Sequence, residues 1–355
     1  MASTFERTLE LSASPAQVFA WHSRRAAFER LVPPWLPISI LDRPEALVDD
    51  SRLSFEVRQG GIGLRWVARH ENVVPGEGFV DVQEKGPFAL WRHEHLMEPA
   101  GSGGSLLRDR IRYRLPLAPL SKWVAGPKIR ADLEAMFAYR HHVTWHDLEM
   151  HRRIGAAPSS LALVAGRTRS ARRIAATLEA ILDTGGHRVE RIEPEADLRG
   201  SEPWDCWVDL ELEGRSARVA GCPSRAVVTA FGSAEPPAER RAVHLHLAPL
   251  HPAPRPLYRR LQGPSEGPWV SVDDAASALA CAALSETLEG TLEVSATAAK
   301  ASPGRQALRS AGFRLRHTDW QQTCRRYEGQ EREAWGESAQ VSAGRRTLVA
   351  LEEER

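Results

Sequence analysis

The spacing of apolar residues changes once in the first half of the chain, and this change constrains the fold more than any other feature. Across residues 53–115, apolar side chains occupy every second position in several separate runs, which is typical of strands with one buried face. Glycine-rich turns separate several of these runs, at 60–61, 75–78 and 101–104. Over 128–148 the spacing becomes helical. The sequence therefore predicts an antiparallel meander covered by one long amphipathic helix.

The chain begins with a predicted strand and a helix that precede this meander. Phe5, Leu9 and Leu11 share the parity of a half-buried strand. Ser14 and Pro15 then supply an N-cap and a first-turn proline for a helix running toward residue 28. A curved sheet held by one long helix does not fill the space between them easily. That space is where we expect an apolar ligand.

The length of 355 residues corresponds to about two domains of ordinary size. A linker of small residues at 154–160 precedes a continuous apolar run at 161–166, which is typical of a parallel strand buried on both faces. A helix and a second strand follow and complete a βαβ unit. We therefore predict an α+β domain over residues 1–154 and an α/β domain over residues 155–355.

Composition excludes several classes of function. Lys and Arg total 47 against 46 for Asp and Glu, so the net charge of +1 provides no general attraction to nucleic acid or to an anionic membrane. The chain shows neither an export signal at its start nor eighteen consecutive apolar residues. The four cysteines form no CxxC pair, and reduced cysteines are usual in the cytoplasm. We expect a cytoplasmic protein without a membrane span.

Two histidines and one aspartate interrupt the apolar face of the meander. His93 and His95 alternate with Trp91, and Asp109 shares a parity with Tyr113 on a later run. If both faces point inward, Asp109 orients an imidazole at the bottom of an apolar pocket. We expect Trp66 to line the same pocket.

Other interpretations of this polar group remain open. The more common one is a structural hydrogen bond that closes the sheet, because buried polar groups usually pair. A metal site needs a third ligand, which the sequence does not place. His142 and His146 lie four residues apart on the long helix, but HHVTWH lacks the glutamate of the HExxH zinc motif, so we expect a solvated or linker-facing helix side there.

Three motifs of the first domain point to a family. They are PPW at 33–35, GPFALWRHEH at 86–95 and DRIRYRLP at 109–116. Together they resemble the START-like helix-grip domains (SRPBCC, cyclase/dehydrase type), specifically those fused to an epimerase-like short-chain dehydrogenase. The resemblance implies a helix-grip domain that binds a hydrophobic small molecule.

The second half of the chain is similar to that same epimerase-like family. The similar segments are LALVAGRTRSA, GPWVSVDDAASALACAAL at 267–284 and AGFRLRHTDWQQTCRRY at 311–327. The resemblance implies a Rossmann-like domain, and the segment 205–269 is shorter than the family's, so we expect a truncated domain that has lost core strands and a helix.

Two family features of dinucleotide chemistry are altered in this chain. In the family a G-x-x-G-x-x-G loop approaches the dinucleotide's pyrophosphate, whereas here those positions are Gly166, Arg169 and Arg172. The resemblance also implies a Tyr-x-x-x-Lys pair, and none of the four tyrosines is followed by lysine four residues later. We expect no cofactor and a catalytically inactive second domain, with Gly166, Arg167 and Arg169 as a vestigial cofactor loop.

Three hypotheses for function follow. The first is hydrophobic ligand binding by the helix-grip domain, with the second domain serving stability or interaction with a protein partner or a second copy. The second is an NADP- or NAD-dependent epimerase or oxidoreductase in which Arg167, Arg169 or Arg172 hold phosphates by charge. The third is cyclase or dehydrase chemistry in the helix-grip pocket, with His93, His95 and Asp109 as acid and base.

Overall fold

A computed structural model describes most of the first 314 residues. The described ranges are 2–33, 35–59, 62–101, 103–116, 120–193, 203–210, 224–230, 241–247, 250–251, 270–294, 303–311 and 313–314. The described residues through Glu149 form one compact unit and those from Met150 onward form a second. The division falls in the last turns of a long helix that ends at Ile154, the residue at which the sequence places the domain boundary.

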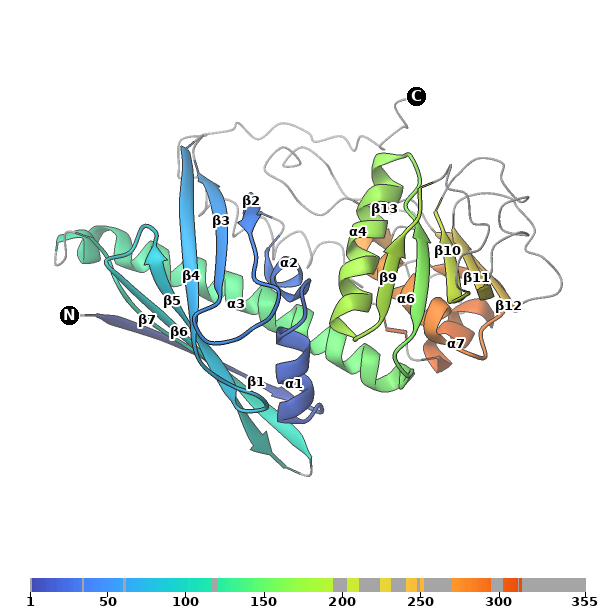
Figure 1. The fold of residues 1–355 in the computed structure, drawn as a ribbon, viewed down its shortest axis with the longest axis horizontal. Coiled ribbons are helices and arrows are strands. Elements are labelled where there is room, and N and C mark those ends of the chain that lie inside the picture. The colour runs from blue at the N-terminus through green and yellow to red at the C-terminus, as the bar shows by residue number, and fades with distance from the viewer. Residues whose placement is uncertain are drawn as a thin grey trace, which may run out of the picture. The chain divides into compact units, whose positions relative to one another are not determined.

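The first unit is a seven-stranded antiparallel sheet with one long helix along it, as the alternating runs predict (Figure 1). The strand order is β1-β7-β6-β5-β4-β3-β2. The elements are β1 (Ser3–Leu11), α1 (Pro15–His22), α2 (Ala27–Leu31), β2 (Ile38–Asp42), β3 (Arg52–Gln59), β4 (Ile62–Val74), β5 (Gly78–Lys85), β6 (Leu90–Ala100), β7 (Gly104–Arg114) and α3 (Leu120–Ile154).

The first helix begins where the sequence predicts and ends earlier. The Ser14 hydroxyl accepts the backbone N–H of Gln17, whose side chain accepts the backbone N–H of Ser14 in return, and Pro15 occupies the first turn. The helix ends at His22, and the hydroxyl of Ser23 donates to the carbonyl of Phe19 at 2.8 Å. The expected single helix toward residue 28 is therefore two helices, α1 and α2.

Helix α3 is longer than the apolar spacing indicates, because it begins at Leu120 and contains Pro127. Its buried apolar face packs on the sheet through Leu133 and Phe137 in one apolar cluster and Val143 and Leu148 in another. These clusters form the two parts of the core of the first unit.

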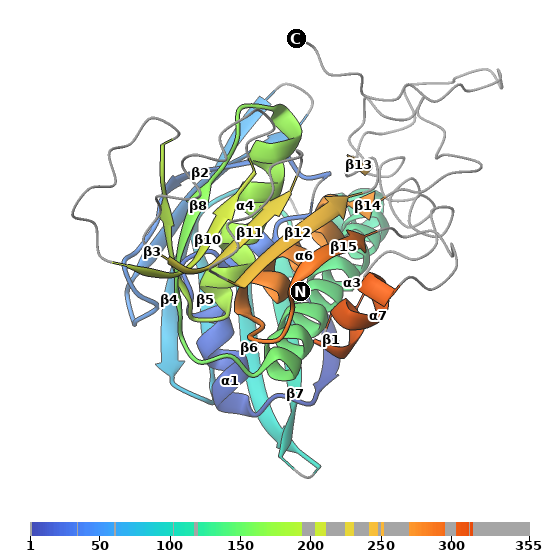
Figure 2. The same cartoon turned by 90° about the vertical axis from the view of Figure 1, so that its right-hand side faces the viewer.

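The second unit is built on a six-stranded parallel sheet with the order β15-β12-β11-β10-β8-β9; Figure 2 shows its central strands side by side. A short pair, β13-β14, stands apart from that sheet. The elements are β8 (Ser160–Val164), α4 (Arg169–Thr184), β9 (Arg188–Arg191), β10 (Trp204–Asp209), β11 (Ser224–Ala230), β12 (Arg241–Leu247), β13 (Leu250–His251), β14 (Val270–Ser271), α6 (Val272–Leu284), β15 (Gly290–Val294) and α7 (Pro303–Ser310).

This sheet has the Rossmann-like character that the sequence predicts, with the first βαβ unit formed by β8, α4 and β9. Helices α4 and α6 pack against each other, and their apolar side chains share one core with the sheet. Three parallel strands lie within 204–247, in the segment where the sequence analysis expected strands to be lost. The expected loss of core strands was therefore wrong for β10, β11 and β12. The residues 211–223 and 231–240 between these strands lie outside the described ranges, so the expected loss of a helix stays a prediction.

None of the helices in the described ranges is long and apolar enough to cross a membrane.

Candidate functional site in the helix-grip unit

Strand register brings a set of polar side chains together on the inner face of the first sheet. His95 of β6 lies directly opposite Asp109 of β7, and His93 lies opposite Asp81 of β5. Asp81 is in turn the partner of His70 on β4. The set, which we call the histidine–aspartate cluster, consists of His70, Asp81, His93, His95, Asp109 and, from helix α3, His141.

Asp109 is the centre of this cluster and contacts three imidazoles. Its Oδ1 lies 3.0 Å from Nε2 of His93 and 2.9 Å from Nδ1 of His95. Its Oδ2 accepts a hydrogen bond of 2.7 Å from Nε2 of His141. The Asp109 side chain is 4% exposed, so these contacts replace water around a buried carboxylate.

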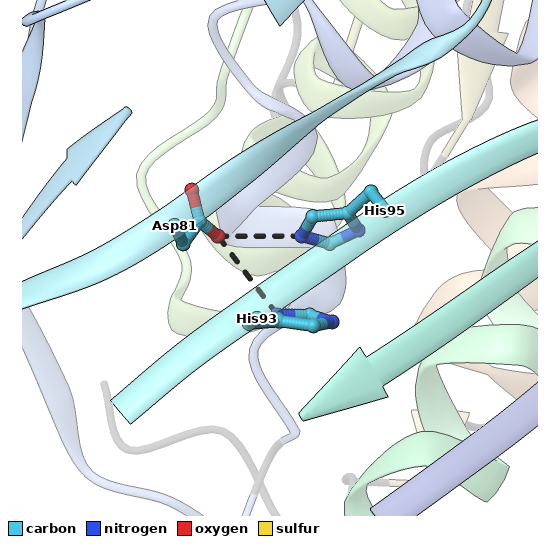
Figure 3. Close-up of side chains that lie close together, drawn as sticks. All are labelled: Asp81, His93 and His95. Atoms are coloured by element: carbon cyan, nitrogen blue, oxygen red, sulfur yellow. Dashed lines mark hydrogen bonds and ion pairs between the residues drawn. The ribbon is translucent and has the colours of Figure 1, made fainter. Parts of the chain in front are cut away.

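Asp81 is the second carboxylate and faces the same two histidines of β6 (Figure 3). Its Oδ2 lies 3.3 Å from Nε2 of His95 and 3.9 Å from Nδ1 of His93. Its Oδ1 lies 3.3 Å from Nε2 of His70, whose Nδ1 contacts the hydroxyl of Ser51 at 2.8 Å. Asp81 keeps 24% of its side chain exposed and is the most accessible of these four cluster members.

Burial and the two carboxylates give the histidines of β6 different protonation states. Burial lowers the pKa of His93 to about 4, and the neighbouring positive charge of His95 adds to the effect. Burial alone would also lower the pKa of His95, but Asp109 and Asp81 outweigh it and raise that pKa to about 9. At neutral pH His95 is therefore an imidazolium between two carboxylates, while His93 is neutral.

The same contacts keep both carboxylates ionised. Burial by itself raises the pKa of Asp109, but hydrogen bonds from three histidines, His141 first, hold it well below its usual range. Burial also acts to raise the pKa of Asp81, and the hydrogen bond and charge of His95 lower it below its usual range.

The cluster lies between the two apolar parts of the core. One part gathers around α1 and includes Phe79, whose ring stacks on His95 with centroids 4.2 Å apart. The other part includes Phe137 of α3, whose ring meets His93 edge-on at 5.3 Å. The charged groups therefore form a belt across the inner face of the sheet, enclosed by apolar side chains on both sides.

Beside this belt, aromatic side chains from four strands, from helix α2 and from the connection between β5 and β6 form a continuous group, which we call the aromatic wall. Its members are Phe28, Phe55, Trp66, Phe88, Trp91 and Tyr113. Trp66 stacks on Phe55 and meets Trp91 edge-on at 5.2 Å. Phe55 and Tyr113 are buried, and the other members are only half-buried. The wall therefore presents aromatic surface that the protein itself does not fully cover.

The structure thus brings together the residues singled out in the first domain. His93, His95 and Asp109 meet in the cluster, and Trp66, Trp91 and Tyr113 meet in the wall. Whether they contact a ligand stays a prediction.

Three cluster members were not predicted from the sequence. His70 shares the alternation of Trp66 and Ala68, so the sequence pattern could have placed it on the inner face of the sheet. Asp81 was overlooked because the apolar residues Val80 and Val82 indicated the opposite parity for β5, whereas its inner face carries Phe79 and Asp81.

The third missed residue is His141, the neighbour of the pair His142 and His146 for which a solvated or linker-facing helix side was expected. His141 is buried and binds Asp109, while His142 and His146 are half-buried with ring centroids 4.3 Å apart. Consecutive residues of a helix point about 100° apart, so the expectation for the pair did not extend to His141, which reaches the sheet.

In the second unit, the loop between β8 and α4 has the position of a dinucleotide loop. Gly166 has φ of +70°, and a Cβ there would lie 2.3 Å from the carbonyl oxygen of Leu210, so the tight turn requires glycine. Arg167 and Arg169 are exposed, and Nη2 of Arg172 donates to the carbonyl of Arg167 at 2.7 Å. The Arg172 side chain is thereby folded back over the loop.

A comparison with known proteins matches most of the first unit. Residues 11–138 match the family model described as polyketide cyclase / dehydrase and lipid transport. The matched residues run from the last residue of β1 into helix α3. No curated protein sequence matches the chain.

Solved structures extend the likeness to both units. A nucleoside-diphosphate sugar epimerase from Corynebacterium glutamicum is 20% identical, with a TM-score of 0.63 over 94% of this chain and 90% of that chain. At this identity the likeness is one of fold, and it includes the fusion of the two units. The Zhui aromatase/cyclase from a Streptomyces species is 15% identical, with a TM-score of 0.34 over 43% of this chain and 96% of that chain. A START superfamily protein from Mycobacterium smegmatis is 18% identical, with a TM-score of 0.29 over 39% and 92%.

Proposed function

We propose that the helix-grip unit binds an apolar small molecule that contains aromatic or fused rings. The aromatic wall is the observation that carries this proposal, because it offers half-buried rings on the inner face of the sheet. The family of residues 11–138 supports it, since that family's description includes lipid transport and polyketide chemistry. The histidine–aspartate cluster would then be the polar anchor at one end of the ligand.

The test is a binding titration with anilinonaphthalenesulfonate, an apolar ring compound whose fluorescence rises in apolar surroundings. Removing one wall ring in Trp66→Ala should weaken binding about tenfold, since a lost aromatic contact and its buried area amount to about 1.4 kcal/mol. Trp145→Ala is the matched control, because Trp145 is exposed on α3 outside the wall. Equal affinity in the two variants would contradict the proposal. Native mass spectrometry of the protein as purified identifies the class of any co-purified ligand.

For the second unit we propose a structural or interaction role without dinucleotide chemistry. The proposal rests on arginine at two of the loop's three glycine positions, on the folded-back Arg172 side chain and on the absence of a Tyr-x-x-x-Lys pair. We expect neither NAD nor NADP at saturating concentration to change the melting temperature of the full chain. A saturable rise with NADP that disappears in Arg169→Ala would favour the oxidoreductase alternative instead.

A catalytic role for the cluster is a second candidate, favoured by one observation. His93 and His95 are adjacent on β6, yet their pKa values of about 4 and about 9 lie on opposite sides of neutrality. Such divergence is a pattern of acid and base pairs. If the co-purified compound changes mass on incubation with fresh protein, and His93→Ala binds it without that change, the unit is a cyclase or dehydrase. Because a cyclisation without loss of water keeps the mass, chromatographic retention is compared as well, and recovery of the same mass and the same retention with both proteins would identify a carrier.

A further inference from the structure

Three donor side chains in the histidine–aspartate cluster are arranged as a set of metal ligands. One donor atom each from Asp81, His93 and His95 lies within 4.8 Å of the other two, on the adjacent strands β5 and β6 (Figure 3). We propose that these three residues bind one divalent transition-metal ion. This inference goes beyond the proposed ligand binding and does not depend on it.

The separations between donor atoms suit a small cation. In a tetrahedral site with metal–ligand bonds of about 2.05 Å, two ligand atoms lie about 3.3 Å apart. Oδ2 of Asp81 is 3.3 Å from Nε2 of His95 and 3.9 Å from Nδ1 of His93. Of these two distances only the one to His93 must shorten, and the two imidazole donor atoms lie within 4.8 Å of each other.

Asp109 orients both imidazoles for this role. Its Oδ1 faces Nε2 of His93 and Nδ1 of His95, at 3.0 Å and 2.9 Å. In the metal-bound state each of these nitrogens would carry the ring proton, and the remaining nitrogen of each ring, which faces Asp81, would bind the ion. His95 would give up its second proton when the ion binds. A carboxylate behind a ligating histidine is the usual support of metal-binding imidazoles in proteins.

Two further contacts hold the carboxylates themselves in place. His141 donates to the second oxygen of Asp109 at 2.7 Å. His70 lies 3.3 Å from the second oxygen of Asp81 and is itself fixed by Ser51. Asp109 is therefore fixed by a hydrogen bond, and Asp81 is contacted by an imidazole, from groups outside the three-residue set.

The ligand set also indicates the kind of metal and the kind of site. Two imidazoles and one carboxylate suit zinc, cobalt and ferrous iron rather than magnesium or calcium, which prefer oxygen ligands. Three protein ligands leave at least one coordination position for water or for an oxygen of a bound molecule. The side chains of His93 and His95 are 3% and 6% exposed, whereas that of Asp81 is 24% exposed, so the open position would face the Asp81 side.

The experiment uses tag-free full-length protein that has been treated with a chelator and then titrated with Co²⁺. We expect one cobalt per chain, with visible absorption typical of four- or five-coordinate Co²⁺ and displacement by Zn²⁺. Asp81→Asn and His93→Gln each remove one ligand while keeping side-chain volume, and each should weaken Co²⁺ binding at least tenfold. Asp109→Asn should weaken it about 10- to 100-fold by loosening both rings.

The matched control is the double variant His142→Gln, His146→Gln, which removes the other close histidine pair of the unit and should bind Co²⁺ as the unaltered protein does. Far-UV circular dichroism shows whether each variant is folded. If a ligand variant unfolds, X-ray absorption spectroscopy of the unaltered protein with Co²⁺ decides instead, because the site predicts two imidazole ligands. The proposal would be overturned if the protein bound no cobalt at one equivalent per chain, or if both ligand variants still bound it. It would also be overturned if the bound cobalt had no imidazole ligand.

Discussion

Replacing Asp109 by asparagine should destabilise the helix-grip unit strongly although the side chain keeps its shape. The carboxylate is 4% exposed and has three imidazole nitrogens within 3.0 Å. Hydrogen bonds to charged groups are worth about 1.5–3 kcal/mol each, and removing one partner from a buried charged group costs about 3–5 kcal/mol. Because these losses overlap within one network, we expect the free energy of unfolding of the chelator-treated protein to fall by about 3–5 kcal/mol in total at pH 7.

Hydrogen exchange of the β6 and β7 amides is the appropriate assay, because it reports on this unit separately from the other. A loss of 3 kcal/mol should raise exchange through opening of the unit on the order of 100-fold. The exposed variant Asp132→Asn is the control and should stay within about 0.5 kcal/mol of the unaltered protein. Folded Asp109→Asn protein with unaltered exchange in β6 and β7 would refute the view that Asp109 holds the cluster together.

The pH dependence of this effect has a definite sign. The pKa of Asp109 is held well below its usual range in the folded protein, so its contribution is present above the unfolded pKa of about 3.9. The difference between Asp109→Asn and the unaltered protein should therefore shrink as the pH falls below about 4. Asp109 is also the first of the groups that raise the pKa of His95, so that pKa should fall from about 9 in the variant. A histidine NMR titration measures this shift.

Three other outcomes follow from the structure. Gly166→Ala should destabilise the second unit by at least about 2 kcal/mol, because φ of Gly166 is +70° and the carbonyl of Leu210 leaves no room for a Cβ. Hydrogen exchange of the β8 amides measures this loss. Unchanged protection of these amides would contradict the tight turn. Arg30→Met should lower the free energy of unfolding in urea by about 3–5 kcal/mol, because it removes two hydrogen bonds of 2.9 Å to the buried Asp147 carboxylate. The double variant Arg30→Met, Asp147→Leu should recover most of that free energy. An equal loss in the single and double variants would contradict this reasoning. Burial lowers the pKa of His22 to about 4, so the unfolded protein binds a proton at this residue more readily than the folded protein between pH 6.5 and 4. The melting temperature should therefore fall by less over this range in His22→Gln than in the unaltered protein. An equal fall in both proteins would contradict this prediction.

The sequence predicted the two architectures well because each rests on a period that burial enforces. The alternation through Trp91, His93 and His95 on β6 and through Asp109 and Tyr113 on β7 is the register that the structure shows. A one-residue slip would turn every one of these side chains to the other face, so the pattern determines the face once the sheet is given.

Details that depend on tertiary contacts were harder to predict. The end of α1 at His22 rests on the local hydrogen bond from Ser23, which competes with continuation of the helix. Asp81 lies on a strand where Val80 and Val82 indicated the opposite parity, and Phe79 and Val80 are both buried, so alternation does not separate the two faces there. The approach of His141 to Asp109 joins residues 32 positions apart on different elements, which no local pattern reports.

The position of the cluster in this pattern supports the proposal that it serves function rather than stability. His93, His95 and Asp109 occupy inward positions of a pattern that is otherwise apolar, where valine or leucine would satisfy the alternation at no cost in desolvation. Burying several charges in one network is weakly stabilising at best, and well-packed apolar replacements are often neutral or better. By placing such a network beside a half-buried aromatic wall, this chain departs from the apolar alternation that stabilises its sheet. In proteins such departures concentrate at binding and catalytic sites.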